Sequence, residues 1–325
     1  MNYENELKAA IYAVTKACNL CANVQYSLVA EDTLKKSDRS PVTIADFGSQ
    51  AIVNLVLGKI YPNDDYVCEE DSVQLRKEES VDLTKKIHAN VIKVFCEVIE
   101  KEMLDAIDLG AGDCDFTGRY WTLDPIDGTK GFLRGDQYAI ALSLIVKGEV
   151  VLGVLGCPNM YYEENNKGVI YFAVKGAGAY ALSIATGKSK RIKVDKISSP
   201  EQAIFCESVE SAHTAHGQSA RIAKLLNVIS NPYRIDSQCK YAAVAEGKAS
   251  VYLRLPTRPD YREKIWDHAA GMIIVQEAGG EVTDITGKRL DFSKSEELVN
   301  NTGVIASNKL LHNAFIGAIE NLTFS

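Results

Sequence analysis

The hydrophobic pattern of this sequence changes twice along the chain, and each change limits the folds that are possible. In the first third, apolar residues recur at helical spacing, which predicts helices over residues 6–28, 43–59 and 83–100. The middle third instead consists of strand-like runs. The strands predicted there cover residues 120–123, 138–146, 150–155 and 169–174. Lys147-Gly148-Glu149 separates two of these strands as a hairpin turn would, so this sheet is predicted to be antiparallel.

Beyond Pro200, strands and helices alternate, which is typical of an α/β arrangement. The elements predicted there are strands over 203–207, 250–255 and 280–283, and helices over 217–226, 237–246, 267–278 and from Asn308 onward. A length of 325 residues also suits two domains, at roughly 150 residues each. We therefore predict an α+β domain over residues 1–197 and an α/β domain over residues 198–325.

The charge and the cysteines limit the partners and the location. Asp and Glu number 43 and Lys and Arg number 36, which gives a formal net charge of −7. A protein that binds DNA or RNA polymers needs a basic surface, so no nucleic-acid polymer is expected as a partner. The eight cysteines are scattered, and Cys18-x-x-Cys21 has no second pair with which to form a zinc site. This usage is typical of reduced thiols, so the expected location is cytoplasmic.

No segment of the chain predicts an association with membranes. The residues after Met1 lack the basic and apolar regions of a signal peptide. The longest apolar run is interrupted at Lys147 and Glu149, short of the roughly 18 residues that a transmembrane helix requires.

The strongest chemical signal is the segment Asp124-Pro-Ile-Asp-Gly-Thr129, which follows a predicted strand. Its proline and glycine favour a tight bend that presents two carboxylates together with the carbonyl group of Ile126. Hard cations such as Mg²⁺ prefer oxygen ligands, so this bend is a candidate metal site. The alternative is an ordinary Asp-Pro/Asp-Gly turn whose acids are solvated.

Three further acidic positions each have two interpretations. Glu69 follows a strand-like run and begins a triplet of acids, which indicates either a nearby cation or a solvated loop. Asp267 opens a predicted helix, where it would interact with the helix dipole or complete a metal site. Asp46 stands three residues after Thr43 in a capping-box pattern, and helix capping alone is a sufficient local explanation for it.

Together these motifs resemble the lithium-sensitive, magnesium-dependent phosphatase superfamily that includes inositol monophosphatase and fructose-1,6-bisphosphatase. The matching segments are Glu69-Glu70, Asp124-Pro-Ile-Asp-Gly-Thr129 and Trp266-Asp-His-Ala-Ala-Gly271. Other segments are similar to the 3′(2′),5′-bisphosphate nucleotidase branch of this superfamily. They are Ser40–Asp46, Gly128–Arg134, Asp236–Tyr241, Val251–Pro256 and Glu263–Gly271.

The resemblance implies a five-layer αβαβα sandwich, with the active site between an α+β part and an α/β part. It implies hydrolysis of the 3′-phosphate of adenosine 3′,5′-bisphosphate to AMP and phosphate by direct attack of water. The related 3′-phosphoadenosine 5′-phosphosulfate is a second candidate substrate. Two or three Mg²⁺ ions are expected as cofactors, with inhibition by Li⁺ and also by Na⁺. We expect a monomer whose partner is a small nucleotide.

The resemblance also assigns roles to individual residues. Asp46 and Thr129 would align and activate the attacking water. The metal ligands would be Glu69, Asp124, the carbonyl group of Ile126, Asp127 and Asp267. The substrate would be bound by Gly128, Thr129, Lys130, His213, Ser237, Lys240, Arg254 and Asp267. His268 is expected to support the site structurally rather than to bind metal.

Alternatives stay open at this point. Lys130 could be solvated, Arg254 could close a surface ion pair, and His213 could be a polar loop residue. The chain could be an inositol polyphosphate 1-phosphatase, as a main or a side activity. It could also be a catalytically silent protein that binds metal or phosphate, although Thr129 and every predicted metal carboxylate are present.

Overall fold

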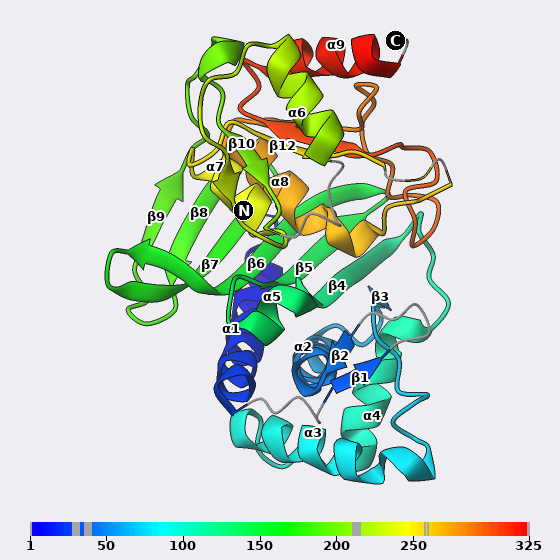
Figure 1. Ribbon diagram of the computed structural model, residues 1–325. Helices are drawn as coiled ribbons and strands as arrows, with labels where there is room; N and C mark the ends of the chain where they lie inside the picture. The colour runs from blue at the N-terminus through cyan, green and yellow to red at the C-terminus, as the bar shows by residue number, and fades with distance from the viewer. Residues whose placement is uncertain are drawn as a thin grey trace.

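Two β-sheets and three groups of helices form alternating layers, which run from the bottom to the top of Figure 1. The computed structural model describes residues 2–27, 33–35, 41–209, 216–256, 258 and 260–323. The five-layer αβαβα sandwich that the resemblance implied is therefore confirmed.

The first layer consists of helices from the N-terminal third of the chain. α1 (Glu4–Ser27) and α2 (Ile44–Ile60) pack on each other and on one face of the larger sheet. α3 (Val81–Val94) and α4 (Glu100–Asp108) also pack on α2. α2 is therefore enclosed by other elements, and every residue from Ile44 to Leu57 is buried. The short strands β1 (Thr33–Lys35) and β2 (Pro41–Thr43) pair antiparallel just before α2.

The larger sheet has seven strands in the order β3-β4-β5-β6-β7-β8-β9. Their bounds are β3 Asp65–Cys68, β4 Arg119–Asp127, β5 Ala139–Val146, β6 Glu149–Glu163, β7 Asn166–Val174, β8 Gly178–Ser183 and β9 Ser189–Ile192. All neighbouring pairs are antiparallel except β3 and β4, which run parallel. The predicted hairpin between β5 and β6 is confirmed, with φ angles of 54° at Lys147 and 75° at Gly148.

The smaller sheet has five strands in the order β11-β10-β12-β14-β13. Their bounds are β10 Phe205–Glu207, β11 Tyr233–Arg234, β12 Val251–Arg254, β13 Glu281–Thr283 and β14 Val304–Ser307. β10 runs parallel to both of its neighbours, and the other pairs are antiparallel. α6 (His216–Leu225) and α9 (His312–Thr323) cover the outer face of this sheet and form the top layer in Figure 1.

The middle layer lies between the two sheets and consists mainly of α7 (Cys239–Ala245) and α8 (Ala269–Glu277). Strand side chains alternate between the layers on the two faces of each sheet. In β12, for example, Tyr252 belongs to the apolar cluster around α7 and α8, whereas Val251 and Leu253 belong to the cluster under α6 and α9. This period of two matches the strand pattern of the sequence.

Some predicted elements are wrong in detail. The helix predicted over 83–100 ends at Val94, because Phe95 has a φ of −132° and Glu97 adopts a left-handed conformation with φ of 67°. The last helix begins at His312 rather than at Asn308, whose side-chain oxygen accepts a hydrogen bond from the N–H group of Leu311. The sequence pattern does not predict α4, β8, β9 or β14.

The predicted domain boundary after residue 197 falls between β9 and β10, and it stays a prediction. The two parts share one apolar cluster, which contains Leu155 and Tyr171 of the larger sheet as well as Tyr252 of the smaller one. α8 belongs to the second predicted domain, yet it packs closely on β6 of the first.

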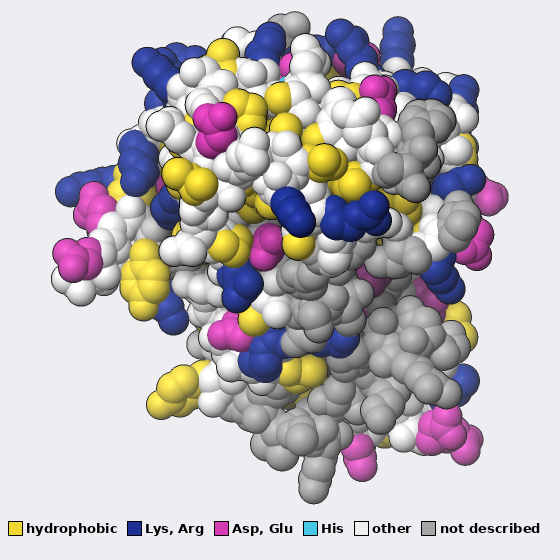
Figure 2. Space-filling view, turned by 45° about the horizontal axis from the view of Figure 1, so that its top comes forward, with side chains coloured by type: hydrophobic (Ala, Val, Ile, Leu, Met, Phe, Trp, Pro, Cys, Tyr) yellow, Lys and Arg dark blue, Asp and Glu magenta, His cyan; other side chains and the backbone are white. Residues whose placement is uncertain are grey.

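The surface and the helices also bear on the expected partners. No helix in the described ranges combines the length and the apolar character that crossing a bilayer requires. On the face shown in Figure 2, Lys and Arg side chains are dispersed among acidic and uncharged ones. A single basic area therefore does not dominate this described face.

Replacing Gly153 by alanine tests the packing of α8 on the larger sheet. A Cβ atom at Gly153 would lie 2.5 Å from Cγ2 of Ile273 and 3.0 Å from Cα of Ala270. Overpacking costs about 1–3 kcal/mol, so we expect the melting temperature to fall by several degrees. Gly112→Ala is the control, because no described atom lies within 4 Å of its Cβ position. An equal melting temperature for both variants would contradict this close approach.

Candidate metal and phosphate site

The parallel pairing of β3 and β4 brings two acidic residues together. Cys68 pairs with Leu123, so the two strands run to the same edge of the sheet. The next residues along the chain are Glu69 and Asp124, and the N–H group of Glu69 donates to the carbonyl group of Leu123 at 3.2 Å. The two acids are therefore neighbours, although they are far apart in the sequence.

A β-bulge brings a third carboxylate, that of Asp127, to the same edge. Asp124 pairs with Ala141 and Asp127 with Ala139. Between these two pairs, β4 therefore contains one residue more than β5. Asp124 and Asp127 would lie on opposite faces of a regular strand, and the extra residue turns them toward one side. β4 thus continues past its predicted end, and the predicted bend is a bulge followed by Gly128 with φ of 92°.

Gly128 has a left-handed conformation and no side chain, which lets two segments pack closely against each other. These are the start of α5 (Thr129–Arg134) and the residues just before α7. A Cβ atom at Gly128 would lie 2.9 Å from Cβ of Ser237, which itself has a φ of 64°. Glycine is therefore required at position 128 for both its φ angle and its lack of a side chain.

Gln238 ties Asp127 to the segment that carries Asp267. Its backbone N–H group donates to Oδ2 of Asp127 at 2.5 Å, and its side-chain amide group donates to the carbonyl group of Trp266 at 2.8 Å. Its side-chain oxygen accepts a hydrogen bond from the N–H group of Gly271 at 3.1 Å. Gln238 therefore helps to hold Asp267, the fourth acid, beside the end of β4.

Contacts from α2 bring Asp46 close to the other acids. Oγ of Ser49 donates to the carbonyl group of Pro125 at 2.9 Å, and the side-chain amide group of Gln50 donates to the carbonyl group of Glu70 at 2.6 Å. Ser49 and Gln50 lie one turn further along α2, so these bonds hold the bulge and the segment after β3 close to the first turn of the helix. Asp46 lies in this turn and is buried.

The acidic residues perturb one another strongly. Burial raises the pKa of Asp124 well above its usual value, and the charges of Glu69, Asp127, Asp267 and Asp46 add to the rise. The pKa of Asp267 is also raised, by burial and then by the charge of Asp127. Oδ1 of Asp124 is buried and has no hydrogen-bond donor among the described residues. A divalent cation fits these residues, because it would neutralise their charge and use the unpaired oxygen.

Basic side chains border this acidic group. Lys240 is buried, and burial lowers its pKa although the charge of Asp127 opposes that shift. Its Nζ atom donates to Oγ of Ser208 at 3.3 Å and lies 5.2 Å from the centre of the Tyr252 ring. Burial raises the pKa of Asp127, and Lys240 and Arg254 limit that rise. Positive and negative groups therefore meet within one site.

One cavity of about 280 Å³ exposes both the acids and the bases. The predicted site residues that line it are Glu69, Asp124, Ile126, Asp127, Gly128, Thr129, Lys130, Ser237, Lys240, Arg254 and Asp267. Asp46 does not line the cavity but is buried close to Asp124. His213 lies outside the described residues. The structure thus brings together all the other residues that were predicted for the site.

Some lining residues were missed by the sequence analysis. They are Gly131, Ser208, Asp236, Gln238, Tyr252, Tyr261 and His268, the last of which was expected only as support. Gln238 and Tyr252 lie inside segments that carried the resemblance, so those segments contained the signal. Ser208 and Tyr261 lie outside every recognised segment, and only the folded chain brings them to the cavity.

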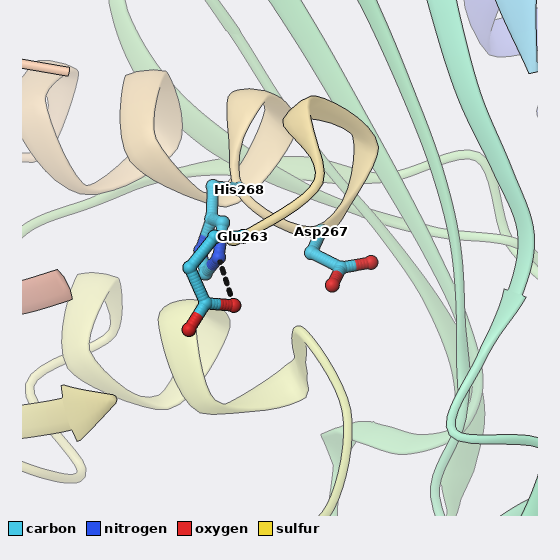
Figure 3. Close-up of side chains that lie close together, drawn as sticks. All are labelled: Glu263, Asp267 and His268. Atoms are coloured by element: carbon cyan, nitrogen blue, oxygen red, sulfur yellow. Dashed lines mark hydrogen bonds and ion pairs between the residues drawn. The ribbon is translucent and has the colours of Figure 1, made fainter. Parts of the chain in front are cut away.

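Glu263, Asp267 and His268 also lie close together, just before α8. Figure 3 shows Glu263 and His268 joined by a hydrogen bond, with the carboxylate of Asp267 pointing away from them. Nε2 of His268 lies 3.1 Å from Oε2 of Glu263, and Nδ1 lies 2.7 Å from the hydroxyl oxygen of Tyr241. Both ring nitrogens are used in these bonds, which suits a structural role for His268 better than metal binding.

Comparison with known sequences finds relatives that match nearly the whole chain. A 3′(2′),5′-bisphosphate nucleotidase from Emericella nidulans is 42% identical, with 99% of each chain covered. The 3′(2′),5′-bisphosphate nucleotidase 1 from Arabidopsis thaliana is 46% identical over 99% of this chain and 97% of the relative. A 3′(2′),5′-bisphosphate nucleotidase from Oryza sativa is 45% identical over 98% of this chain and 94% of the relative.

Solved structures share the fold. The inositol monophosphatase of Thermotoga maritima matches with a TM-score of 0.68 and 22% identity, over 98% of each chain. The extragenic suppressor protein SuhB of Bartonella henselae matches with a TM-score of 0.69 and 21% identity, over 98% of this chain and 99% of that one. A sequence model of the inositol monophosphatase family matches residues 2–323. The chain therefore belongs to the inositol monophosphatase family and, within it, to the 3′(2′),5′-bisphosphate nucleotidases.

Proposed function

We propose that this enzyme hydrolyses the 3′-phosphate of adenosine 3′,5′-bisphosphate in a magnesium-dependent reaction that yields AMP and phosphate. The observation that carries the proposal is a single cavity whose lining includes the four proposed metal-binding acids, a fifth carboxylate from Asp236, and the cations Lys130, Lys240 and Arg254. A ligand with two phosphate groups suits this arrangement, because one phosphate can meet the metal-binding acids and the other the cations. 3′-Phosphoadenosine 5′-phosphosulfate carries the same 3′-phosphate and is proposed as a second substrate.

The proposed metal ligands are Glu69, Asp124, the carbonyl group of Ile126, Asp127 and Asp267. All of them offer hard oxygen donors, which suits two Mg²⁺ ions, with Glu69 contributing to a third. The ions, when bound, neutralise charge on the phosphoryl group and lower the pKa of water. We propose that Li⁺ and Na⁺ inhibit by competing for one of these positions.

Asp46 and Thr129 are the proposed pair that aligns the attacking water. In the structure the hydroxyl group of Thr129 donates to the carbonyl group of Ile126 at 3.3 Å, a long hydrogen bond. The proposal requires this hydroxyl to turn and donate to Asp46, so that its oxygen can accept from the water. The water oxygen then forms a bond to phosphorus while the bond from phosphorus to O3′ breaks. The proton of the water passes to Asp46, and O3′ takes up a proton from solvent.

The other proposed contacts bind and orient the substrate. The backbone N–H groups of Gly128 and Thr129 and the side chain of Lys130 would contact the phosphate that is cleaved. Ser237, Lys240 and Arg254 would contact the remainder of the nucleotide, with Arg254 on the second phosphate because its planar fork matches phosphate oxygens. His213 is proposed for the same role.

We also propose that the protein acts as a monomer in the cytoplasm. All eight cysteines are free thiols, which suits a reducing compartment. The cavity is lined by described residues of a single chain, so a second copy is not needed to form its walls.

Asp124→Asn tests whether the acidic cluster is a metal site. The variant removes a buried charge that its neighbours disfavour, so the metal-free protein should melt a few degrees higher. Mg²⁺ should raise the melting temperature of the wild type but not of the variant, because a central ligand is lost. Glu164→Gln is the control, since it makes the same change of charge at an exposed position between β6 and β7. A lower melting temperature with an intact response to Mg²⁺ would make Asp124 a structural residue instead.

The gain in stability from Asp124→Asn should depend on pH. The pKa values of Asp124 and Asp267 are raised in the folded protein, whereas in the unfolded chain they are about 3.9. The stability of the metal-free wild type therefore falls as pH rises from the unfolded toward the folded pKa values. Thermal melts in a chelator should show a difference between variant and wild type that grows over this interval. A difference that shrinks with rising pH would contradict the raised pKa values.

A substrate panel tests the activity itself. Phosphate release is measured with adenosine 3′,5′-bisphosphate, 3′-phosphoadenosine 5′-phosphosulfate and inositol 1,4-bisphosphate at equal concentrations. We expect the adenosine substrates to be hydrolysed fastest with Mg²⁺, slowly when Li⁺ is added, and not at all in a chelator. Turnover of the inositol substrate alone would identify an inositol polyphosphate 1-phosphatase. No magnesium-dependent turnover of any phosphate ester would identify a catalytically silent protein.

A further inference from the structure

Arg254 enters the cavity from the end of β12, and its guanidinium group is held by two neighbours. Nε lies 3.3 Å from both carboxylate oxygens of Glu263, and Nη2 donates to the hydroxyl group of Tyr261 at 3.3 Å. The side chain of Arg254 is only 22% exposed. A guanidinium group carries five N–H groups, so these contacts leave others for an anion in the cavity.

Glu263 is itself fixed by a buried chain of hydrogen bonds. Its side chain is 5% exposed, and Oε2 accepts a hydrogen bond from Nε2 of His268 at 3.1 Å (Figure 3). Nδ1 of His268 is bonded in turn to the hydroxyl group of Tyr241 at 2.7 Å. The N–H group of Leu298 donates to the backbone carbonyl group of Glu263 at 2.8 Å. The carboxylate therefore has a defined position before any ligand binds.

Close packing fixes the far end of this chain of bonds. The ring of Tyr241 packs edge to face on that of Tyr252, with 5.1 Å between the ring centres. A Cβ atom at Gly271 would lie 2.2 Å from the Tyr241 ring, so this position of α8 has no room for a side chain. Tyr241 is thus held between β12 of the smaller sheet and α8 of the middle layer. Its hydroxyl group therefore gives His268, and through it Glu263, a fixed partner.

We propose that Glu263 is a positioning residue that orients Arg254 toward the second phosphate group of the substrate, and that His268 and Tyr241 hold Glu263 in place. This inference rests on the proposed function, because it takes a bisphosphate as the substrate. Glu263 is not among the residues that line the cavity, so it acts through Arg254 rather than on the substrate. An arginine that is oriented in advance loses less side-chain freedom on binding, which favours a low KM.

The charge of Glu263 agrees with this role. Burial alone would raise the pKa of Glu263, but hydrogen bonding and charge from His268, followed by the charge of Arg254, hold the pKa below its usual value. The carboxylate is therefore ionised where it meets Arg254, and charge-assisted hydrogen bonds are the stronger kind.

The test compares Glu263→Gln with the wild type on two substrates. For adenosine 3′,5′-bisphosphate, KM should rise by about tenfold or more while kcat stays within about threefold, as for a lost charge-assisted hydrogen bond. For adenosine 3′-phosphate, which lacks the second phosphate, kcat/KM should change little. Glu296→Gln is the control, because it removes an exposed charge that pairs with Lys264 and does not touch Arg254. An equal loss on both substrates would overturn the proposal and make Glu263 a structural residue.

A double variant provides an independent readout. Arg254→Ala alone should raise KM for the bisphosphate, and adding Glu263→Gln should raise it no further, because Glu263 acts through Arg254. If the increase in KM of the double variant equalled the product of the two single increases, the proposal would be overturned. Tyr241→Phe keeps the ring but removes the last hydrogen bond of the chain, and it should give a smaller rise in the same KM even if Glu263→Gln folds poorly.

These experiments test the role of Glu263 separately from the identity of the substrate. If the wild type hydrolyses inositol 1,4-bisphosphate but neither adenosine substrate, the proposed substrate is wrong. The same variants are then compared on inositol 1,4-bisphosphate and inositol 1-phosphate, where the positioning role again predicts a rise in KM only when the second phosphate is present.

Discussion

The gathering of carboxylates at one edge of the larger sheet is the constraint on which the rest of the site depends. The parallel pairing of β3 with β4 supplies Glu69 and Asp124, the bulge in β4 adds Asp127, and Gln238 connects these to Asp267. Such a group is unfavourable in a metal-free protein, because burial and mutual repulsion disfavour its charged form. The fold tolerates it because the surrounding layers fix every backbone segment involved.

The same cluster reconciles an acidic chain with an anionic substrate. A net charge of −7 argues against binding of a nucleic-acid polymer, yet it does not prevent the binding of a small bisphosphate. Divalent cations would convert the acidic end of the cavity into an anion site, and Lys240 and Arg254 provide fixed positive charge beside it. On this view the substrate binds well only after the metal ions have bound. Glu263 orients the guanidinium group of Arg254 toward the second phosphate.

Local patterns in the sequence predict much of the fold, whereas the site depends on contacts that no local pattern contains. The hairpin at Lys147 and Gly148 follows from turn chemistry, and the five layers follow from the resemblance. The parallel pairing of β3 with β4 joins strands that are far apart in sequence, and the bulge after Asp124 breaks the regular alternation of β4, so periodicity indicates neither of them. α3 ends early beside Glu97, which adopts a left-handed conformation. Because this residue is not a glycine, the sequence does not indicate that conformation. Gln238 and Glu263 matter through partners that only the folded chain brings near.

The measurement that tests this view most directly is the number of protons released when Mg²⁺ binds to the metal-free enzyme. Calorimetric titrations in two buffers with different ionisation enthalpies give this number. Because folding raises the pKa values of Asp124 and Asp267, binding of the cation should release protons, and the release should fall as pH rises and in Asp124→Asn. Tight binding of Mg²⁺ without any proton release at pH values just above the ordinary aspartate pKa of about 3.9 would contradict the view that a mutually repelling group of acids forms the metal site.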